Sequence, residues 1–147
     1  MKTVHFRDIN DDNRSDVMRI SLNENQLDFI ESVADCLKEA EETKEWHPLA
    51  IYVNECVVGF AMYGSFDNNK YTWIDRIMID KKHQMQGIGK VAMLKLIDVV
   101  SSEYKVDTLY LSIIEKNYIA RKLYEGIGFR YINEKDENGE LIFEYKV

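Results

Sequence analysis

A predicted strand that leads through a polar turn into two closely spaced glycines restricts the fold of this chain more than any other feature. The strand covers residues 71–79, and apolar residues at three- and four-residue steps predict a helix over residues 87–102. The first turn of a helix has backbone N–H groups without intrahelical acceptors and a partial positive charge. Gly87 and Gly89 would let a phosphate approach that turn closely. The segment therefore predicts a pyrophosphate site at a strand-to-helix junction.

Glycine spacing alone leaves an alternative open, in which one glycine serves a turn and the other serves packing at an ordinary helix start. The spacing is not that of the dinucleotide fingerprint, which requires Gly-x-Gly-x-x-Gly and an acid about 20 residues later. A Walker A loop is also excluded, because the sequence lacks Gly-x-x-x-x-Gly-Lys followed by Ser or Thr.

The remaining elements predict one mixed sheet with helices packed on its faces, an α/β or α+β fold. The hydrophobic pattern places Pro48 at the end of the helical region that precedes the second strand. We expect strands at residues 4–8, 49–53, 57–63, 71–79, 108–114, 129–133 and 140–146, and helices at residues 14–22, 26–42, 87–102 and 118–127.

Length and composition favour a single domain spanning residues 1–147. The N-terminal residues lack the apolar run of a signal peptide, and no uncharged apolar stretch approaches the ~20 residues that span a bilayer. We therefore expect a cytoplasmic protein with no membrane partner. Cys36 and Cys56 lack a nearby histidine pattern, so neither a zinc site nor any other metal is expected.

The formal net charge of −7 argues against a nucleic-acid partner, and most of this charge is local. Residues 23–45 contain eight acids and two lysines, which gives this segment a charge of −6. On the helix predicted there, the acids form a stripe beside the apolar face. The stripe is either a solvated helix face or an acidic wall that attracts a polycation.

The chain has two motifs in sequence. The first is Gln84-x-x-Gly87-x-Gly89, and the second is Asn117-x-x-Ala120-x-x-Leu123-Tyr124-x-x-x-Gly128-Phe129, about 30 residues downstream. Both resemble motifs of the GNAT family of N-acetyltransferases. Residues 26–30, 48–52 and 58–63 further resemble the bacterial diamine and spermine/spermidine acetyltransferases. The resemblance covers almost the whole chain. It implies a mostly antiparallel mixed sheet of about seven strands, with helices on both faces and with the fourth and fifth strands splayed apart.

The resemblance also implies an acetyl-CoA site. The backbone of the strand that enters the loop would bind the pantetheine arm, and Asn117 would face the pantetheine or the thioester, although Asn also suits a helix N-cap. The implied pantetheine strand residues are Ile77, Met78 and Ile79, and the residues implied around the pyrophosphate are Gln84, Met85, Gln86, Gly87, Ile88, Gly89 and Lys90.

Tyr124 is the implied catalytic acid, because a phenol can protonate the thiolate that leaves when an amine attacks a thioester. The alternative is a core tyrosine packed near Phe129. The attacking amine must first lose a proton, and the candidate bases are Asp75, Glu115 or a chain of water molecules. Either carboxylate could instead pair with a neighbouring lysine or arginine.

The sequence thus predicts direct acetyl transfer from acetyl-CoA to a primary amine within a ternary complex. The resemblance and the acidic segment favour a polyamine as the acceptor, with Glu24, Asp28 and Glu31 as its binding residues. A protein N-terminus or a lysine is an alternative acceptor, and an acyl-CoA-binding module without turnover is an alternative of another class. A homodimer is compatible with the sequence.

Overall fold

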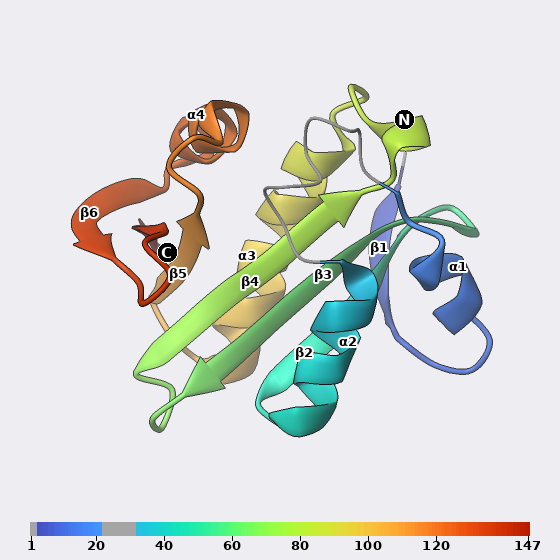
Figure 1. Cartoon of the computed structure of the whole chain (residues 1–147), viewed down its shortest axis with the longest axis horizontal. Coiled ribbons are helices and arrows are strands. Elements are labelled where there is room, and N and C mark those ends of the chain that lie inside the picture. The colour runs from blue at the N-terminus through green and yellow to red at the C-terminus, as the bar shows by residue number, and fades with distance from the viewer. Residues whose placement is uncertain (1–2, 22–31) are drawn as a thin grey trace.

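The computed structural model describes residues 3–21 and 32–147, which form one seven-stranded sheet with four α-helices (Figure 1). The substrate residues expected at Glu24, Asp28 and Glu31 lie outside the described residues. The elements in chain order are β1 Val4–Asp8, α1 Arg14–Met18, α2 Val33–Glu42, β2 Trp46–Val53, β3 Cys56–Phe66, β4 Tyr71–Ile79, a 3₁₀ turn Lys81–His83, α3 Ile88–Tyr104, β5 Thr108–Ile113, α4 Tyr118–Ile127, β6 Arg130–Lys135 and β7 Leu141–Lys146.

The sheet has the strand order β1-β2-β3-β4-β5-β7-β6. All neighbouring strands pair antiparallel except β4 and β5, which are parallel. The connection between these two strands is α3, as parallel neighbours require a crossover. The predicted mixed sheet of about seven strands is therefore confirmed.

Two apolar cores cover the two faces of the sheet, and the central strand β3 contributes to both. Side chains alternate between the faces of a strand. Phe60 and Met62 accordingly pack in the core under α1 and α2, whereas Ala61 and Tyr63 pack in the core under α3. Figure 1 shows α2 in front of the sheet and α3 behind it. The prediction of helices on both faces is confirmed.

The structure corrects two predicted boundaries near the N-terminus. The first helix ends at Met18 rather than near residue 22. Pro48 lies inside β2 and does not precede the strand. It is tolerated there because β1 pairs with β2 only as far as Leu49, so the start of β2 is an edge on that side and needs no N–H donor.

The predicted helix over residues 26–42 is described only from residue 32 onward. Ser32 is its N-cap, and its hydroxyl accepts a hydrogen bond from the Asp35 N–H at 3.1 Å. None of the helices in the described ranges is long and apolar enough to cross a membrane. Within the same ranges, no group of three His, Cys, Asp or Glu side chains is arranged to hold a metal ion.

Candidate active site

A cavity of about 440 Å³ opens between β4 and β5, where the two strands separate. Its walls come from both strands, the loop after β4, the start of α3 and one face of α4. Most of the residues predicted for acetyl-CoA binding and for catalysis line this cavity. They are Asp75, Ile77, Met78, Ile79, Gln84, Met85, Gly87, Ile88, Gly89, Lys90, Asn117 and Tyr124.

The cavity exists because β4 and β5 pair at one position only, Trp73 with Tyr110. Beyond that pair, the register between β3 and β4 slips, so that Asp75 is an extra residue opposite β3. A bulge of this kind bends its strand and increases its local twist. The bend coincides with the point where β4 diverges from β5, which confirms the splayed fourth and fifth strands.

Gly87 lines the cavity and is the N-cap of α3. Its φ of +77° is a left-handed conformation, and a Cβ placed there would meet no atom within 4 Å. The first intrahelical hydrogen bond of α3 runs from the Val91 N–H to the Gly87 carbonyl, at 3.2 Å. The N–H groups of Ile88, Gly89 and Lys90 therefore have no acceptor within the helix. This open helix start, together with the positively charged Lys90 that also lines the cavity, fits a pyrophosphate.

Gln84 has a structural part in the loop. Its Nε2 donates a hydrogen bond to the Ile79 carbonyl at 2.8 Å, which ties the loop back to the end of β4. Met85 follows with a φ of +63° and a fully exposed side chain that lines the cavity mouth. Gln86 is exposed and is not among the residues that line the cavity.

The three β4 residues before the loop line the cavity and also pack in the cores. Met78 is buried under α1 and α2, whereas Ile77 and Ile79 pack against the core under α3. Their side chains therefore serve packing, as the sequence analysis allowed. Because β5 pairs with none of them, the β4 backbone edge faces the cavity.

Tyr124 reaches the cavity from α4. Its ring packs edge-on against Phe129, with 6.0 Å between the ring centroids, and its side chain is partly buried. Burial raises the pKa of the Tyr124 phenol to about 12. The phenol is therefore neutral at physiological pH and carries the proton that a general acid needs.

Asn117 caps α4, and its side-chain oxygen accepts a hydrogen bond from the Ala120 N–H at 3.2 Å. The same residue lines the cavity. The sequence predicts a capping role or a role beside the thioester for Asn117, and the geometry is compatible with both.

The two candidate bases lie in different environments. Asp75 lines the cavity and is partly buried, with its Oδ1 3.5 Å from Nη1 of Arg76. Glu115 is not among the cavity residues, and its exposed carboxylate lies 3.7 Å from Nζ of Lys135. The structure thus brings Asp75, and not Glu115, into one cavity with Tyr124.

Glu140 is a cavity residue that the sequence analysis did not select. It is partly buried, and its Oε1 accepts a hydrogen bond from the Ser112 hydroxyl at 3.3 Å. The turn before β7 fixes its backbone, because Asp136 Oδ1 accepts from the Glu140 N–H and the Asp136 N–H donates to the Glu140 carbonyl, both at 2.9 Å. The sequence predicts the turn, but it does not show that the Glu140 side chain, which follows the turn, points into the cavity.

The chain is matched by the model of the acetyltransferase (GNAT) family over residues 14–129. It is 39% identical over 146 residues to a probable spermine N(1)-acetyltransferase of Bacillus subtilis subsp. natto, covering 95% of this chain and 96% of that protein. It is 38% identical, with the same coverage, to the spermine/spermidine N(1)-acetyltransferase of Bacillus subtilis strain 168.

Solved structures of low sequence identity share the fold. PaiA N-acetyltransferase of Thermoplasma acidophilum in complex with coenzyme A has a TM-score of 0.71 at 15% identity and covers 99% of both chains. Spermidine N-acetyltransferase of Vibrio cholerae in complex with CoA and spermine has a TM-score of 0.73 at 14% identity and covers 96% of this chain and 92% of that one. The match of the family model over residues 14–129 and the 39% identity over nearly the whole chain show that the chain belongs to the acetyltransferase (GNAT) family.

Proposed function

We propose that this acetyltransferase moves the acetyl group of acetyl-CoA to a primary amine of a polyamine such as spermine or spermidine. The observation that carries the proposal is the 39% identity, over nearly the full length of both chains, to a probable spermine N(1)-acetyltransferase. The splayed strands and the open start of α3 support acetyl-CoA as the donor.

Two groups of residues that line the cavity support different partners. The open helix start and Lys90 suit the negative charge of a pyrophosphate, and His83 lies beside them. Asp75 and Glu140 supply carboxylates from β4 and from the start of β7. A polyamine presents ammonium groups separated by methylene chains, so carboxylates beside apolar walls match its chemistry.

The proposed reaction is a direct displacement. The acceptor ammonium loses one proton, and its nitrogen lone pair then attacks the thioester carbonyl carbon, forming a C–N bond as the C–S bond breaks. The sulfur takes the electron pair, and Tyr124 donates its phenolic proton to it. The nitrogen of the product still carries one proton more than an amide does, and this proton passes through water to the Tyr124 phenolate, which restores the phenol. Asp75, a carboxylate that lines the cavity, is proposed to accept the proton of the amine, directly or through water. Since one continuous cavity would hold both substrates, transfer is proposed to occur within a ternary complex.

An acceptor competition experiment tests the polyamine. Spermine, spermidine, a monoamine of similar length and peptides with a free N-terminus or a lysine are offered at equal concentration with limiting acetyl-CoA, and the products are identified by mass spectrometry. Acetylated polyamine should dominate. Preferential acetylation of a peptide would replace the proposal with a protein acetyltransferase.

The Glu140→Gln variant should raise KM for spermine by about 10-fold, because a charge-assisted hydrogen bond worth about 1.5 kcal/mol is lost. The dissociation constant of acetyl-CoA should stay unchanged, since Glu140 lies outside the glycine loop. Glu137→Gln is the matched control, because Glu137 is an exposed acid of the same turn and is not among the cavity residues. Equal spermine KM values in the two variants would remove Glu140 from the acceptor site.

A further inference from the structure

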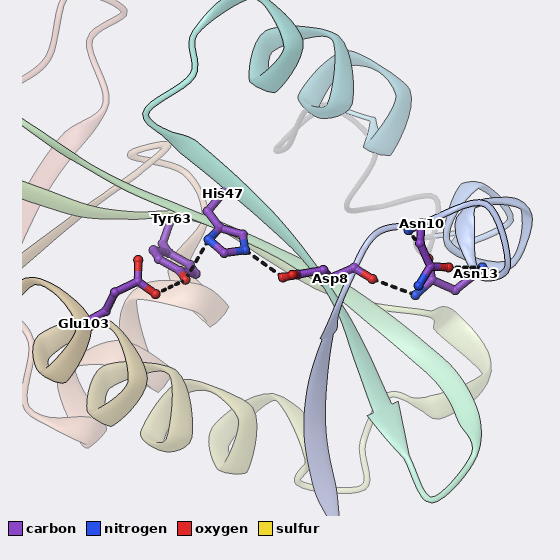
Figure 2. A network of polar contacts seen from close by, with 6 residues as sticks. All are labelled: Asp8, Asn10, Asn13, His47, Tyr63 and Glu103. Carbon is purple, nitrogen blue, oxygen red and sulfur yellow. Dashed lines mark hydrogen bonds and ion pairs between the residues drawn. The ribbon is translucent and has the colours of Figure 1, made fainter.

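Four side chains form a continuous row of polar contacts outside the cavity (Figure 2). Asp8 Oδ1 lies 2.8 Å from His47 Nε2, and His47 Nδ1 lies 2.9 Å from the Tyr63 hydroxyl. The Tyr63 hydroxyl donates to Glu103 Oε1 at 2.7 Å. The row thus joins β1, β2, β3 and α3 through three short contacts, all of them away from the reacting groups.

Tyr63 determines how the protons of this row are distributed. The residue is 1% exposed, and burial, followed by the nearby Glu103 carboxylate, raises the pKa of its phenol far above the ordinary value. The phenol therefore keeps its proton. If it donates that proton to Glu103, its oxygen can only accept from His47, and Nδ1 of the imidazole must carry a hydrogen.

The three contacts need one hydrogen more than the four side chains supply when His47 is neutral and both carboxylates are ionised. Each of the three contacts requires one hydrogen. A neutral imidazole supplies one, the phenol supplies a second, and two ionised carboxylates supply none. With a neutral His47, one contact would therefore place two acceptors against each other, for instance Nε2 against the Asp8 carboxylate at 2.8 Å.

We propose that the row binds protons as one unit, formed by Asp8, His47, Tyr63 and Glu103. When the unit holds three protons, all three contacts form. When it holds two protons, one contact is lost. The contact given up is that of Asp8, whose side chain is 76% exposed, so water can replace His47 as its partner. Tyr63 and Glu103 stay paired with each other in both states. The unit is a pH-sensitive clamp between α3 and the edge of the sheet.

The backbone of Asp8 also connects the clamp to the start of α1. Glu103 belongs to α3 behind the sheet, and the Asp8 carbonyl accepts a hydrogen bond from Nδ2 of Asn13 at 2.9 Å. Asn13 is buried at the start of α1, where it exchanges hydrogen bonds with Asn10, as Figure 2 shows. Release of the Asp8 carboxylate would remove the side-chain link between β1 and β2 and leave this backbone hydrogen bond in place.

Other titratable side chains surround this unit on the neighbouring elements. β1 contributes His5, and α3 contributes Lys95 and Asp98 along a surface groove of about 600 Å³. Tyr104 packs edge-on against Tyr63, with 6.0 Å between the ring centroids. Because the groove is open to solvent, protons can exchange with water. On this proposal, the contact between Asp8 and His47 stabilises the fold while the third proton is bound, and it is lost when that proton leaves.

Amide substitutions at the two ends of the row test the proton count, because each amide supplies the missing hydrogen. Asp8→Asn supplies it at the His47 end, and Glu103→Gln supplies it at the Tyr63 end. In Asp8→Asn, the new amide donates to Nε2, so a neutral His47 keeps its hydrogen on Nδ1. In Glu103→Gln, the amide donates to the Tyr63 oxygen, Tyr63 donates to Nδ1, and His47 keeps its hydrogen on Nε2. Nitrogen-15 NMR of the imidazole reads these tautomers directly. In the wild type, the doubly protonated ring should persist to a higher pH than in either variant.

Asp98→Asn is the matched control, since it removes a carboxylate of the same groove that is not part of the row. It should leave the His47 tautomer and titration as in the wild type. On raising the pH through that titration, the Tm of the wild type should fall by about 2–4 °C relative to Asp8→Asn. The proposal is overturned if Glu103→Gln and Asp8→Asn show the same tautomer, or if Asp98→Asn changes the titration as much as they do.

Discussion

The Gly87→Glu variant is expected to lose acetyl-CoA binding, with a dissociation constant raised at least ~100-fold. Space is available for the new side chain, since a Cβ at Gly87 meets no atom within 4 Å, but that space is where the pyrophosphate would lie. The added carboxylate would also repel the phosphates across a short distance. Isothermal titration calorimetry with acetyl-CoA measures the effect.

The control for this variant is Gly139→Glu. Gly139 has a φ of +80°, close to that of Gly87, and a Cβ there also meets nothing within 4 Å. A non-glycine residue in this conformation costs about 1–2 kcal/mol at either site, so both variants should lose similar stability. Only Gly87→Glu should lose acetyl-CoA. Wild-type affinity in folded Gly87→Glu would remove the loop from the donor site.

Tyr124→Phe is expected to lower kcat by about 10²–10⁴-fold while the affinity for acetyl-CoA stays unchanged. The substitution keeps the ring that packs against Phe129 and removes only the hydroxyl. The measurement is a single-turnover rate, which isolates the chemical step from product release.

Tyr118→Phe is the matched control, because Tyr118 lies on the same helix and is 71% exposed. Since the pKa of Tyr124 is raised to about 12, loss of its proton should cause no fall in kcat between pH 7 and pH 10. A tyrosine at the ordinary value near 10 would begin to fail in that range. Equal single-turnover rates in Tyr124→Phe and Tyr118→Phe would make Tyr124 a packing residue.

The regular elements that are described could largely be predicted from the sequence. The residues of β4 and α4 agree with the prediction at both ends, because turn residues flank β4 and an N-cap and a glycine bound α4. The loop motif likewise placed Gly87 at the start of α3. These features depend on local sequence, which a single chain reveals.

Features that depend on how strands align could not be predicted. The bulge at Asp75 comes from a register shift against β3, and the row from Asp8 to Glu103 requires four distant segments to meet. Glu140 lines the cavity because the turn before β7 fixes its backbone, and the sequence does not show where that turn lies in space. The prediction that Glu24, Asp28 and Glu31 bind the acceptor concerns residues outside those described, and it stays a prediction.

The most direct test of the proposed function is release of CoA thiol by the purified chain supplied with acetyl-CoA and spermine, with the amine product identified by mass spectrometry. One thiol should be released for each acetylated spermine, and release should stop when either substrate is withheld. If acetyl-CoA binds but no amine of a broad panel releases thiol, the chain is an acyl-CoA-binding module and the proposed transfer is wrong.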